Sequence, residues 1–594
     1  MSVETARDPV RWPRLFPWGV AALGVVMHLW AMWGGFFHMD DFFYLADASR
    51  PFGDYVSQIY NGHLMPLGFA IVWLSQAALP MSWPLAVLVC TLLWAVFLAG
   101  VVMCMKAAFG ERPWTTVIVT VVALSPLLTT VTTWYASALQ VLPWGAALAW
   151  MLYFTVRDAQ TPRIVFAIGG LVAYLVGLAF WQKTVLVLPV VFWIAWRYWP
   201  GEGRWGLRGL GRRWLLPVAS VGITVPFMAI YFASQPEQVL RSDPTLEQFI
   251  DSIRISLGEV WLPAYLGGPW AGFTPGLSPG TAAAWWAVLL VWQVVAALVV
   301  VSLLRWRLAW NAWILIAGYA LLTVVLFAFG RINDFGLVLA YDPRYVEDLF
   351  IVGALVLPFA FVRPAGSPLA EPRRLDWLPG RVPVVVACAG MVVLVNLLIM
   401  TSIAVGSSWH DSAAKRYVAQ AKASFEANLD TPVLDRKVPP EVMAPLFLER
   451  ANASYVLSGL RLPVRWTEAG TTVLALKDDG TLVEPVLATS STSVPGLSGE
   501  CGWAVKDVPT NIEMDTTSFE WIWVAHMDYI ASGGGVATVS LAGPPTEVPV
   551  HEGLGDITFV VKGSGDTVVM TPPAGVGLCV TQLTLAQVDY GALP

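Results

Sequence analysis

Charged residues are scarce in this sequence. Only 13% of its 594 residues are Asp, Glu, Lys or Arg, about half the share that soluble domains carry. Hydrophobic residues make up 57% of the chain, which predicts a polytopic α-helical membrane protein. Basic residues are outnumbered by acidic ones, the formal net charge is −6, and no basic stripe with interleaved aromatic residues is present. These features exclude nucleic acid as a partner.

Cysteine is also rare, with five residues in the whole chain. The sequence contains no CxxC pair and no Cys/His spacing typical of a metal site, which excludes a zinc-ribbon or thioredoxin-like motif. Three cysteines, Cys90, Cys104 and Cys388, lie in apolar runs, where a free thiol behaves as a small hydrophobic group. Only Cys501 and Cys579 lie in polar sequence.

Long apolar runs, by contrast, are abundant. A membrane-spanning helix needs about 20 mostly apolar residues, and eleven runs of the chain qualify. The short basic N-terminus has no small-residue cleavage site close behind its first apolar run, which indicates a retained helix and not a signal peptide. We expect spans at residues 17–36, 83–105, 114–132, 138–156, 163–181, 184–200, 213–233, 282–304, 308–329, 345–363 and 382–405.

The basic residues predict how these spans are oriented. If the apolar run 64–81 lies along the membrane interface as an amphipathic helix, every basic cluster falls on one side of the membrane. The positive-inside rule then places the N-terminus in the cytoplasm and the C-terminal region outside the plasma (inner) membrane. The outer loops include a long first loop over residues 37–82 and a late loop that begins at Gly330.

The last third of the sequence has a different composition. After a membrane domain at 1–407, residues 408–451 carry an Ala-rich amphipathic pattern that predicts a helical connector. From residue 452 onward, short β-branched runs alternate with Gly, Pro, Asp and Ser, which predicts an extracytoplasmic, mostly-β sandwich domain over 452–594. This domain could bind carbohydrate. Three of its tryptophans could stack on a sugar or could instead fill the core: Trp503, Trp521 and Trp523.

Cys501 opens this polar region and Cys579 lies near its end. Disulfides form and persist outside an inner membrane, so we expect a bridge between the two that ties the first strand of the domain to the last. The alternative is a pair of buried free thiols.

Two adjacent acids interrupt the aromatic stretch FFHMDDFFYLADA, which opens the first outer loop. Asp40 and Asp41 could simply flank a span and remain in water. Three features favour a functional site: the aromatic surroundings, the segment YNGHLMPLGF that could cover the pair, and the cations Arg331 and Arg344 on the same side of the membrane. Acids and cations that can converge at one membrane face are typical of such a site.

This order of features resembles the GT-C class of integral-membrane glycosyltransferases. The shared features are one span, a long outer loop that opens with an acidic pair, an interfacial helix (GHLMPLGFAIVWL) and many further spans. The class includes protein O-mannosyltransferases and actinobacterial arabinosyl- and mannosyltransferases, and its members use polyprenyl-phosphate sugars as donors. The layout also looks like that of actinobacterial membrane proteins of similar length.

The resemblance implies a set of roles. In that class an acid of the first outer loop is the usual catalytic base or metal ligand, and this role falls on Asp40 or Asp41. The segment AYDPRYVEDLF resembles a late-loop Arg-Tyr element that contacts lipid-linked phosphate, which implicates Arg344 and Tyr345. The expected reaction moves a sugar from a polyprenyl-phosphate donor to a glycan, lipid or protein of the cell envelope.

The chemistry of the residues agrees with these roles. A carboxylate can take the proton of the attacking acceptor hydroxyl, and a cation must stabilise the charge that grows on the leaving phosphate. Arg344, supported by Tyr345, is the first candidate because a guanidinium binds phosphate through a bidentate fork. Arg331 is the second candidate and Lys183 the third, although Lys183 could instead extend to the membrane interface.

A divalent cation is a further expectation for this loop. The adjacent carboxylates of Asp40 and Asp41 could bind Mg²⁺, Mn²⁺ or Ca²⁺, which prefer oxygen ligands. His38 and His63 lie in the same loop and could support such a site. Histidines in such a place more often make interfacial hydrogen bonds.

Glu347 and Asp348 follow Arg344 closely in sequence. They could position its guanidinium by charge pairing, and we include them as supporting residues.

Two other functions compete with sugar transfer. A transporter or lipid flippase would carry charged or Gly/Pro-broken segments near the midplane and internal repeats. The sequence shows no clear repeat, and its candidate charges lie at the outer face. A non-enzymatic envelope scaffold, whose β domain binds a partner, is the other alternative.

Overall fold

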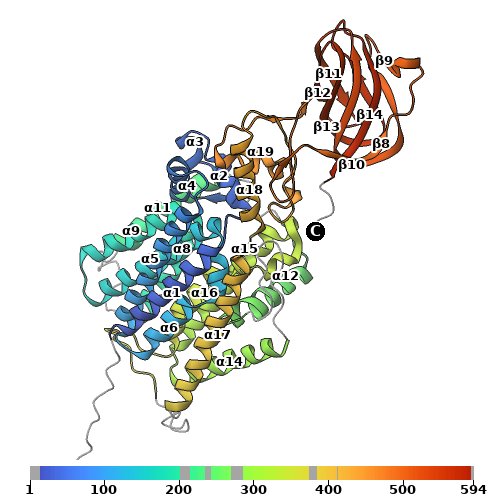
Figure 1. Cartoon of the computed structure of the whole chain (residues 1–594). Coiled ribbons are helices and arrows are strands. Elements are labelled where there is room, and N and C mark those ends of the chain that lie inside the picture. Colours follow the sequence, from blue (N-terminus) through green and yellow to red (C-terminus); the bar gives the residue numbers. More distant parts are fainter. Residues whose placement is uncertain are drawn as a thin grey trace, which may run out of the picture. The chain divides into compact units, whose positions relative to one another are not determined.

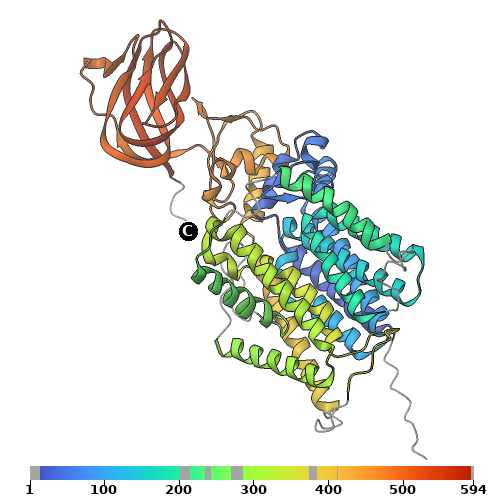
Figure 2. The same ribbon diagram turned by 180° about the vertical axis from the view of Figure 1, so that it is seen from behind.

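The computed structural model describes residues 14–200, 215–234, 242–268, 285–373, 384–410 and 412–589. The chain divides into two compact units, Met1–Ser412 and Ala413–Pro594. The first is built from helices and the second mainly from strands (Figures 1 and 2).

Long apolar helices form the first unit, which we call the membrane unit. In it α8 packs between α5 and α9, and α1 packs against α5 (Figures 1 and 2). The longer helices are α1 (Phe16–Gly34), α4 (Pro66–Ala78), α5 (Trp83–Phe109), α6 (Pro113–Ala123), α8 (Tyr135–Gln160), α9 (Ile164–Phe180), α10 (Val187–Tyr198), α11 (Leu215–Ser234), α14 (Trp285–Arg305), α15 (Ala309–Phe335), α16 (Glu347–Val356) and α17 (Val384–His410).

The membrane unit has fewer clear spans than the sequence predicted. Within the described residues, seven helices are long and apolar enough to cross a membrane, or eight if α6 and α7 (Pro126–Thr132) form one bent span. Each of the eleven expected runs contains a helix or a helix pair, but α9, α10 and α16 have only 17, 12 and 10 residues. A hydropathy window counts apolar residues across helix breaks. One expected span, for example, contains both the 3-10 helix Gln182–Leu186 and α10.

The bend between α6 and α7 has a local cause. Pro126 cannot donate a backbone hydrogen bond to the preceding turn, and the two helices meet at 43° just before it. Ser125 is the N-cap of α7, and its Oγ accepts a hydrogen bond from Leu128 N at 3.3 Å. The run 113–132 is therefore helical but broken.

Two glycines allow the two ends of the membrane unit to meet. A Cβ atom at Gly34 would collide with the ring of His410, and a Cβ atom at Gly35 would collide with the ring of Trp409. The imidazole Nε2 of His410 also lies 3.2 Å from the carbonyl oxygen of Trp30. The C-terminal end of α17 is thus packed against the residues that lead into the first loop.

The second unit, which we call the β unit, begins with α18 (Ala413–Ala427) and short helical and extended segments. Its main part is one eight-stranded antiparallel sheet, in which β10 pairs with both β13 and β14. The strands are β5 (Ala469–Gly470), β8 (Val486–Thr492), β9 (Trp503–Val505), β10 (Thr510–Ala531), β11 (Gly535–Ser540), β12 (Thr546–Val550), β13 (Gly553–Thr571) and β14 (Leu578–Asp589).

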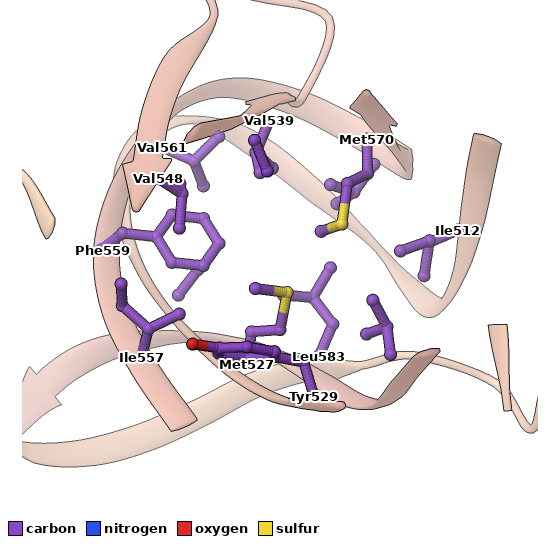
Figure 3. Packing of buried hydrophobic residues seen from close by; sticks show 14 of the residues in the cluster. Ile512, Met527, Tyr529, Val539, Val548, Ile557, Phe559, Val561, Met570 and Leu583 are labelled. Carbon is purple, nitrogen blue, oxygen red and sulfur yellow. The ribbon is translucent and has the colours of Figure 1, made fainter. Parts of the chain in front are cut away.

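The expected sandwich is realised as one bent sheet around a main core, and a smaller cluster of Leu434, Val473, Val524 and Val560 packs elsewhere in the unit. Strands β10 and β13 have 22 and 19 residues, and their pairing shifts register between Glu513 and Ser518 and again before Trp521. Such bulges bend a strand, so the same long strands can line opposite sides of the core. Figure 3 shows Met527, Phe559 and Leu583 pointing into that core from the surrounding strands.

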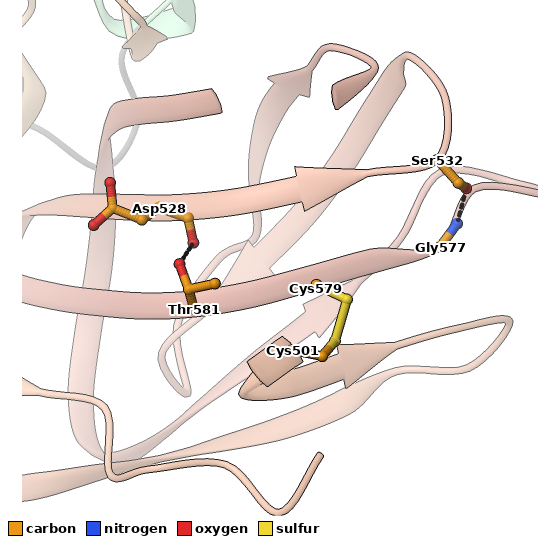
Figure 4. The surroundings of a disulfide bond; sticks show 6 residues. All are labelled: Cys501, Asp528, Ser532, Gly577, Cys579 and Thr581. Atoms are coloured by element: carbon orange, nitrogen blue, oxygen red, sulfur yellow. Dashed lines mark hydrogen bonds between the residues drawn. A yellow bond between two sulfur atoms is a disulfide. The ribbon is translucent and has the colours of Figure 1, made fainter. Parts of the chain in front are cut away.

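A disulfide closes the β unit, between the two cysteines that the sequence predicted to pair. Cys501 and Cys579 are bonded, with their Cα atoms 4.9 Å apart, and the bond joins the segment before β9 to β14 (Figure 4). The other described cysteines, Cys90 and Cys104, are free and buried.

Removing this bond is expected to destabilise the β unit. The bridge closes a chain segment of 78 residues, and loss of a native disulfide typically costs about 2–5 kcal/mol of unfolding free energy. We expect the Cys501→Ser/Cys579→Ser variant to unfold at lower denaturant concentration than the wild-type chain. Cys104→Ser is the control for thiol removal. A double variant whose midpoint equals that of the wild type would contradict the prediction.

Candidate active site around Asp40 and Arg344

The two acids of the first loop open helix α2 (Asp40–Asp47), where negative charge is favoured by the helix dipole. Asp41 is fully buried, and both of its carboxylate oxygens accept backbone hydrogen bonds. Oδ2 accepts from His38 N at 2.8 Å and Oδ1 from Ala136 N at 2.7 Å. Ala136 lies in the first turn of α8. Asp41 therefore ties the start of α2 to the start of α8.

Asp40 has a different environment. Adjacent helix residues point about 100° apart, and the Asp40 carboxylate accepts no hydrogen bond from the described residues. Burial raises the pKa of Asp40 above its ordinary value, while the nearby charges of Arg344 and Arg331 act in the opposite direction. Of the two acids, Asp40 is thus the one whose oxygens are available to a substrate.

Arg344 is held in place by an acid that the sequence analysis did not name. Asp342 caps the 3-10 turn Pro343–Tyr345. Its Oδ2 accepts hydrogen bonds from Nε and Nη2 of Arg344 at 2.8 and 2.6 Å. The guanidinium carbon lies 3.9 Å from the centre of the Trp134 ring. Burial opposes the charge of this guanidinium, but the contact with Asp342 keeps the pKa of Arg344 above its ordinary value.

The expected pairing of Arg344 with Glu347 or Asp348 is therefore corrected, because Asp348 has another partner. Its Oδ2 lies 2.8 Å from Nζ of Lys183 and accepts a hydrogen bond from the Tyr319 hydroxyl at 2.7 Å. Asp348 is fully buried and Glu347 nearly so, and Oε2 of Glu347 has no partner among the described residues. Neither acid is bonded to Arg344 there.

Lys183 consequently does not extend freely to an interface. Its ammonium is ion-paired with Asp348 and lies 5.0 Å from the centre of the Trp181 ring. Within the described residues, Asp348 uses one of the three N–H donors of this ammonium.

Arg331 holds a turn of the first loop. Strands β1 (Ile59–Tyr60) and β2 (His63–Leu64) form a hairpin whose Asn61 and Gly62 have positive φ values of 48° and 76°. Nη2 of Arg331 donates to the carbonyl oxygen of Asn61 at 2.8 Å. Gln182 and Tyr231 donate to the carbonyl oxygen of Gly62 at 2.7 and 2.6 Å. The Asn-Gly pair is a strong hairpin signal that would have located this turn in the sequence.

Both histidines of the loop are uncharged at neutral pH. Burial, reinforced by the charge of Arg344, lowers the pKa of His38 to about 3. Burial together with Arg331, Lys183 and Arg344 lowers the pKa of His63 to about 3. Nδ1 of His63 accepts a hydrogen bond from Trp181 Nε1 at 3.2 Å, so the proton of the neutral ring is on Nε2. The His38 ring packs against Trp134 and Trp409.

For the expected divalent cation, the described residues of the acidic pair offer one carboxylate with free oxygens, that of Asp40. In the described parts of the chain, no group of three or more His, Cys, Asp or Glu residues is placed to hold a metal ion. Both oxygens of Asp41 are already bound by backbone N–H groups. We therefore derive no step through a metal.

The structure brings several predicted site residues into one electrostatic neighbourhood. The charge of Arg344 acts on His38, Asp40 and His63, and that of Arg331 acts on Asp40 and His63. The ring of Tyr345 packs 4.9 Å from that of Phe327 and is also within reach of these charges. Asp342 was not among the residues predicted from the sequence. Its position directly before the Pro-Arg-Tyr turn, where an aspartate often caps the turn, could have indicated its role.

Comparison with known proteins gives matches at the level of structure alone. No family model matches the chain, and no curated protein matches it. ArnT from Cupriavidus metallidurans bound to undecaprenyl phosphate has 13% identity and a TM-score of 0.43 over 77% of this chain and 92% of that chain. Arabinofuranosyltransferase AftD from Mycobacteria has 11% identity and a TM-score of 0.38. This chain is covered over 98% of its length in that comparison and spans 59% of AftD. The chain is distantly similar in structure to these two proteins, at TM-scores below 0.5. Its own multi-helix membrane unit is followed in sequence by an antiparallel β-sheet unit.

Proposed function

We propose that the chain is a membrane glycosyltransferase that moves a sugar from a polyprenyl-phosphate donor to a hydroxyl group of a cell-envelope glycan, lipid or protein, on the extracytoplasmic side. The observation that carries the proposal is Asp40. Its carboxylate has no hydrogen-bond donor among the described residues, yet it lies within the electrostatic reach of Arg344 and Arg331. This reaction needs a carboxylate with free oxygens and, within its electrostatic reach, cations that can bind phosphate.

The chemical step uses these groups as follows. The acceptor hydroxyl oxygen attacks the anomeric carbon and its proton passes to Asp40. The bond between the anomeric carbon and the phosphate oxygen breaks, and its electron pair leaves with the polyprenyl phosphate. Arg344 stabilises that charge. Its Nε and Nη2 are occupied by Asp342, whereas Nη1 makes no hydrogen bond among the described residues and can face the phosphate.

An apolar cavity supports the choice of a lipid-linked donor. It has a volume of about 350 Å³ and lies between the helical segment Arg254–Ala264 and helices α14, α15 and α16. Its wall includes Trp261, Tyr265, Trp292 and Trp313. Helix α15 also carries Arg331, and α16 follows directly after Arg344 and Tyr345. We propose that part of the prenyl chain occupies this cavity.

A reconstituted assay tests the function. The full chain in liposomes would receive undecaprenyl-phosphate-linked mannose, glucose, galactose or arabinofuranose, together with cell-envelope extract as acceptor. We expect acceptor-dependent release of undecaprenyl phosphate from at least one donor, measured by mass spectrometry. Arg344→Met should reduce the rate by about 10²–10³-fold, as removal of a charge-stabilising group at a transition state does.

Arg14→Met is the matched control, because Arg14 has an exposed side chain that pairs with Glu111 and belongs neither to the candidate site nor to the cavity wall. Movement of the lipid across the bilayer with no new glycosidic bond would instead support a flippase. If no donor of the panel is consumed and no lipid moves, the proposal is wrong and an envelope scaffold is the alternative function that is left.

A further inference from the structure

Four arginines lie at the end of the membrane unit opposite to the candidate active site. Helix α10 begins shortly after Lys183 and carries one of the four in its last turn. Two others belong to the connection between α14 and α15, and the far end of α15 carries Arg331. The positive-inside rule predicts that the end with the four arginines faces the cytoplasm. We call them the arginine cluster: Arg197, Arg305, Arg307 and Arg373.

Contacts of neighbouring residues bring the arginine cluster together. Trp306 separates the two arginines of the α14–α15 connection, and its ring centre lies 5.9 Å from that of Tyr198, the residue after Arg197. The backbone N–H of Arg373 donates to the carbonyl oxygen of Arg305 at 2.8 Å. Three segments that are distant in sequence therefore supply arginines to one place.

The guanidinium of Arg197 is held in a fixed orientation. Its Nε donates to Oδ1 of Asn311 at 2.6 Å. Its central carbon lies 5.1 Å from the ring centres of both Trp196 and Trp310, and 6.0 Å from that of Trp193. Among the described residues, Nη1 and Nη2 make no hydrogen bond. The rings of Trp196 and Trp310 are 48% and 39% exposed, so a ligand can reach this guanidinium from the surface.

The arginine cluster has no acidic partner among the described residues. Three other basic residues at the same end do have one. Arg14 and Lys106 both pair with Glu111, and Arg363 pairs with Glu371. The described acids of this end therefore leave the positive charge of the arginine cluster without a counter-ion, and such a surface attracts anions at a membrane interface.

We propose that the arginine cluster binds the phosphate group of an anionic phospholipid, with Arg197 as the main contact. The guanidinium fork matches the geometry of phosphate oxygens, and basic pockets between membrane helices suit anionic headgroups. A zwitterionic headgroup would also bring an ammonium group, which the arginines repel.

The two exposed rings beside Arg197 fit the same ligand. Tryptophan side chains gather at the level of the headgroups, so Trp196 and Trp310 can pack against the glycerol and the upper acyl chains of the lipid. The proposal is independent of the transfer reaction, because this end of α10 and α15 is opposite to the one that carries Lys183 and Arg331.

Native mass spectrometry tests the proposal with the full chain in detergent micelles. Phosphatidylglycerol and phosphatidylcholine of equal chain length would be titrated separately, and the dissociation constant of the first bound lipid measured. We expect the wild type to bind phosphatidylglycerol about tenfold more tightly. Arg307→Gln, at an exposed position, should weaken this binding about fivefold, the usual effect of one basic residue at an anionic surface. Arg197→Gln should weaken it about tenfold, because a preorganised charge-assisted contact is lost. Neither variant should change the binding of phosphatidylcholine.

Arg14→Gln is the matched control, since it removes the same charge from an exposed side chain at the same end. Its affinity for phosphatidylglycerol should stay within about twofold of the wild type, and Arg307→Gln should unfold at the wild-type temperature. The proposal is overturned if the two lipids bind equally, if Arg307→Gln binds phosphatidylglycerol as the wild type does, or if Arg14→Gln weakens it as much. Displacement of the lipid by inorganic phosphate, or tighter binding of polyglutamate to the same arginines, would overturn it as well, because the ligand would then be a soluble anion or an acidic protein.

Discussion

Replacing Asp40 by Asn is expected to reduce sugar transfer by about 10²–10⁴-fold, the usual contribution of a general base, without unfolding the chain. The amide keeps the size of the side chain but cannot take the proton of the acceptor hydroxyl. Because no protein group bonds to the Asp40 carboxylate among the described residues, the substitution breaks no structural contact. Release of undecaprenyl phosphate measures the rate, and a thermal unfolding curve checks the fold.

Asp41→Asn is the matched control, and we expect it to lower the stability of the chain and not to remove the catalytic base. An amide presents one acceptor oxygen where the carboxylate presents two, so either His38 N or Ala136 N loses its partner. A buried unsatisfied donor costs about 1–3 kcal/mol, and we expect a lower unfolding temperature. Wild-type rates from Asp40→Asn, or loss of transfer by Asp41→Asn with unchanged stability, would reverse the assignment of the base.

The pH dependence gives an independent check on Asp40. A base must be ionised to act, so activity should fall as pH drops through its pKa. Burial raises that pKa, and the acid limb should therefore lie above the ordinary value of an aspartate, about 3.9. Arg344 lowers the pKa, so in Arg344→Gln the limb of the residual activity should move to higher pH. A limb that stays in place in this variant would contradict the electrostatic contact.

Asp348→Asn is expected to destabilise the membrane unit strongly. The change leaves the ammonium of Lys183 without its anionic partner, and breaking one side of a buried ion pair typically costs about 3–5 kcal/mol. Denaturant unfolding in detergent measures the loss. Double replacement by Lys183→Met and Asp348→Leu should recover part of it, because both charges of this ion pair are then removed together.

Glu347→Gln provides the contrast to this prediction. Oε2 of Glu347 has no partner among the described residues, and the direct ion pair of Lys183 is with Asp348, although the charge of Lys183 also acts on Glu347. Glu347→Gln should therefore cost less stability than Asp348→Asn. Equal destabilisation by the two variants would contradict the assignment of Asp348 as the main partner of Lys183.

The sequence located the helices well, because apolar runs follow directly from the needs of a membrane span. It was less able to predict how long each helix runs. A hydropathy window does not register the proline break before Pro126 or the 3-10 segment Gln182–Leu186. In the β unit, alternating β-branched runs revealed strands. The bulges of β10, which turn an expected sandwich into one bent sheet, have no simple composition signal.

For the candidate site, residue types could be predicted but partners could not. The pair Asp40–Asp41 stood out by charge, yet only the turn of α2 decides that Asp41 faces the backbone of α8. The neighbour of Arg344 in space is Asp342, two residues before it. Arg344 pairs with Asp342 and not, as expected, with Glu347 or Asp348. The short capping turn holds the Asp342 carboxylate beside the guanidinium at little cost in chain entropy.

The packing of α17 against Gly34 and Gly35 sets the order in which the site can be assembled. His38 is made early in synthesis, but Trp409, whose ring centre lies 5.4 Å from that of His38, is made more than 370 residues later. A ribosome-bound chain that ends before residue 384 therefore has the acids of the first loop but lacks one wall around His38. The surroundings of Asp40 and Asp41 are therefore complete only after α17, one of the last helices of the membrane unit, has been synthesised and packed.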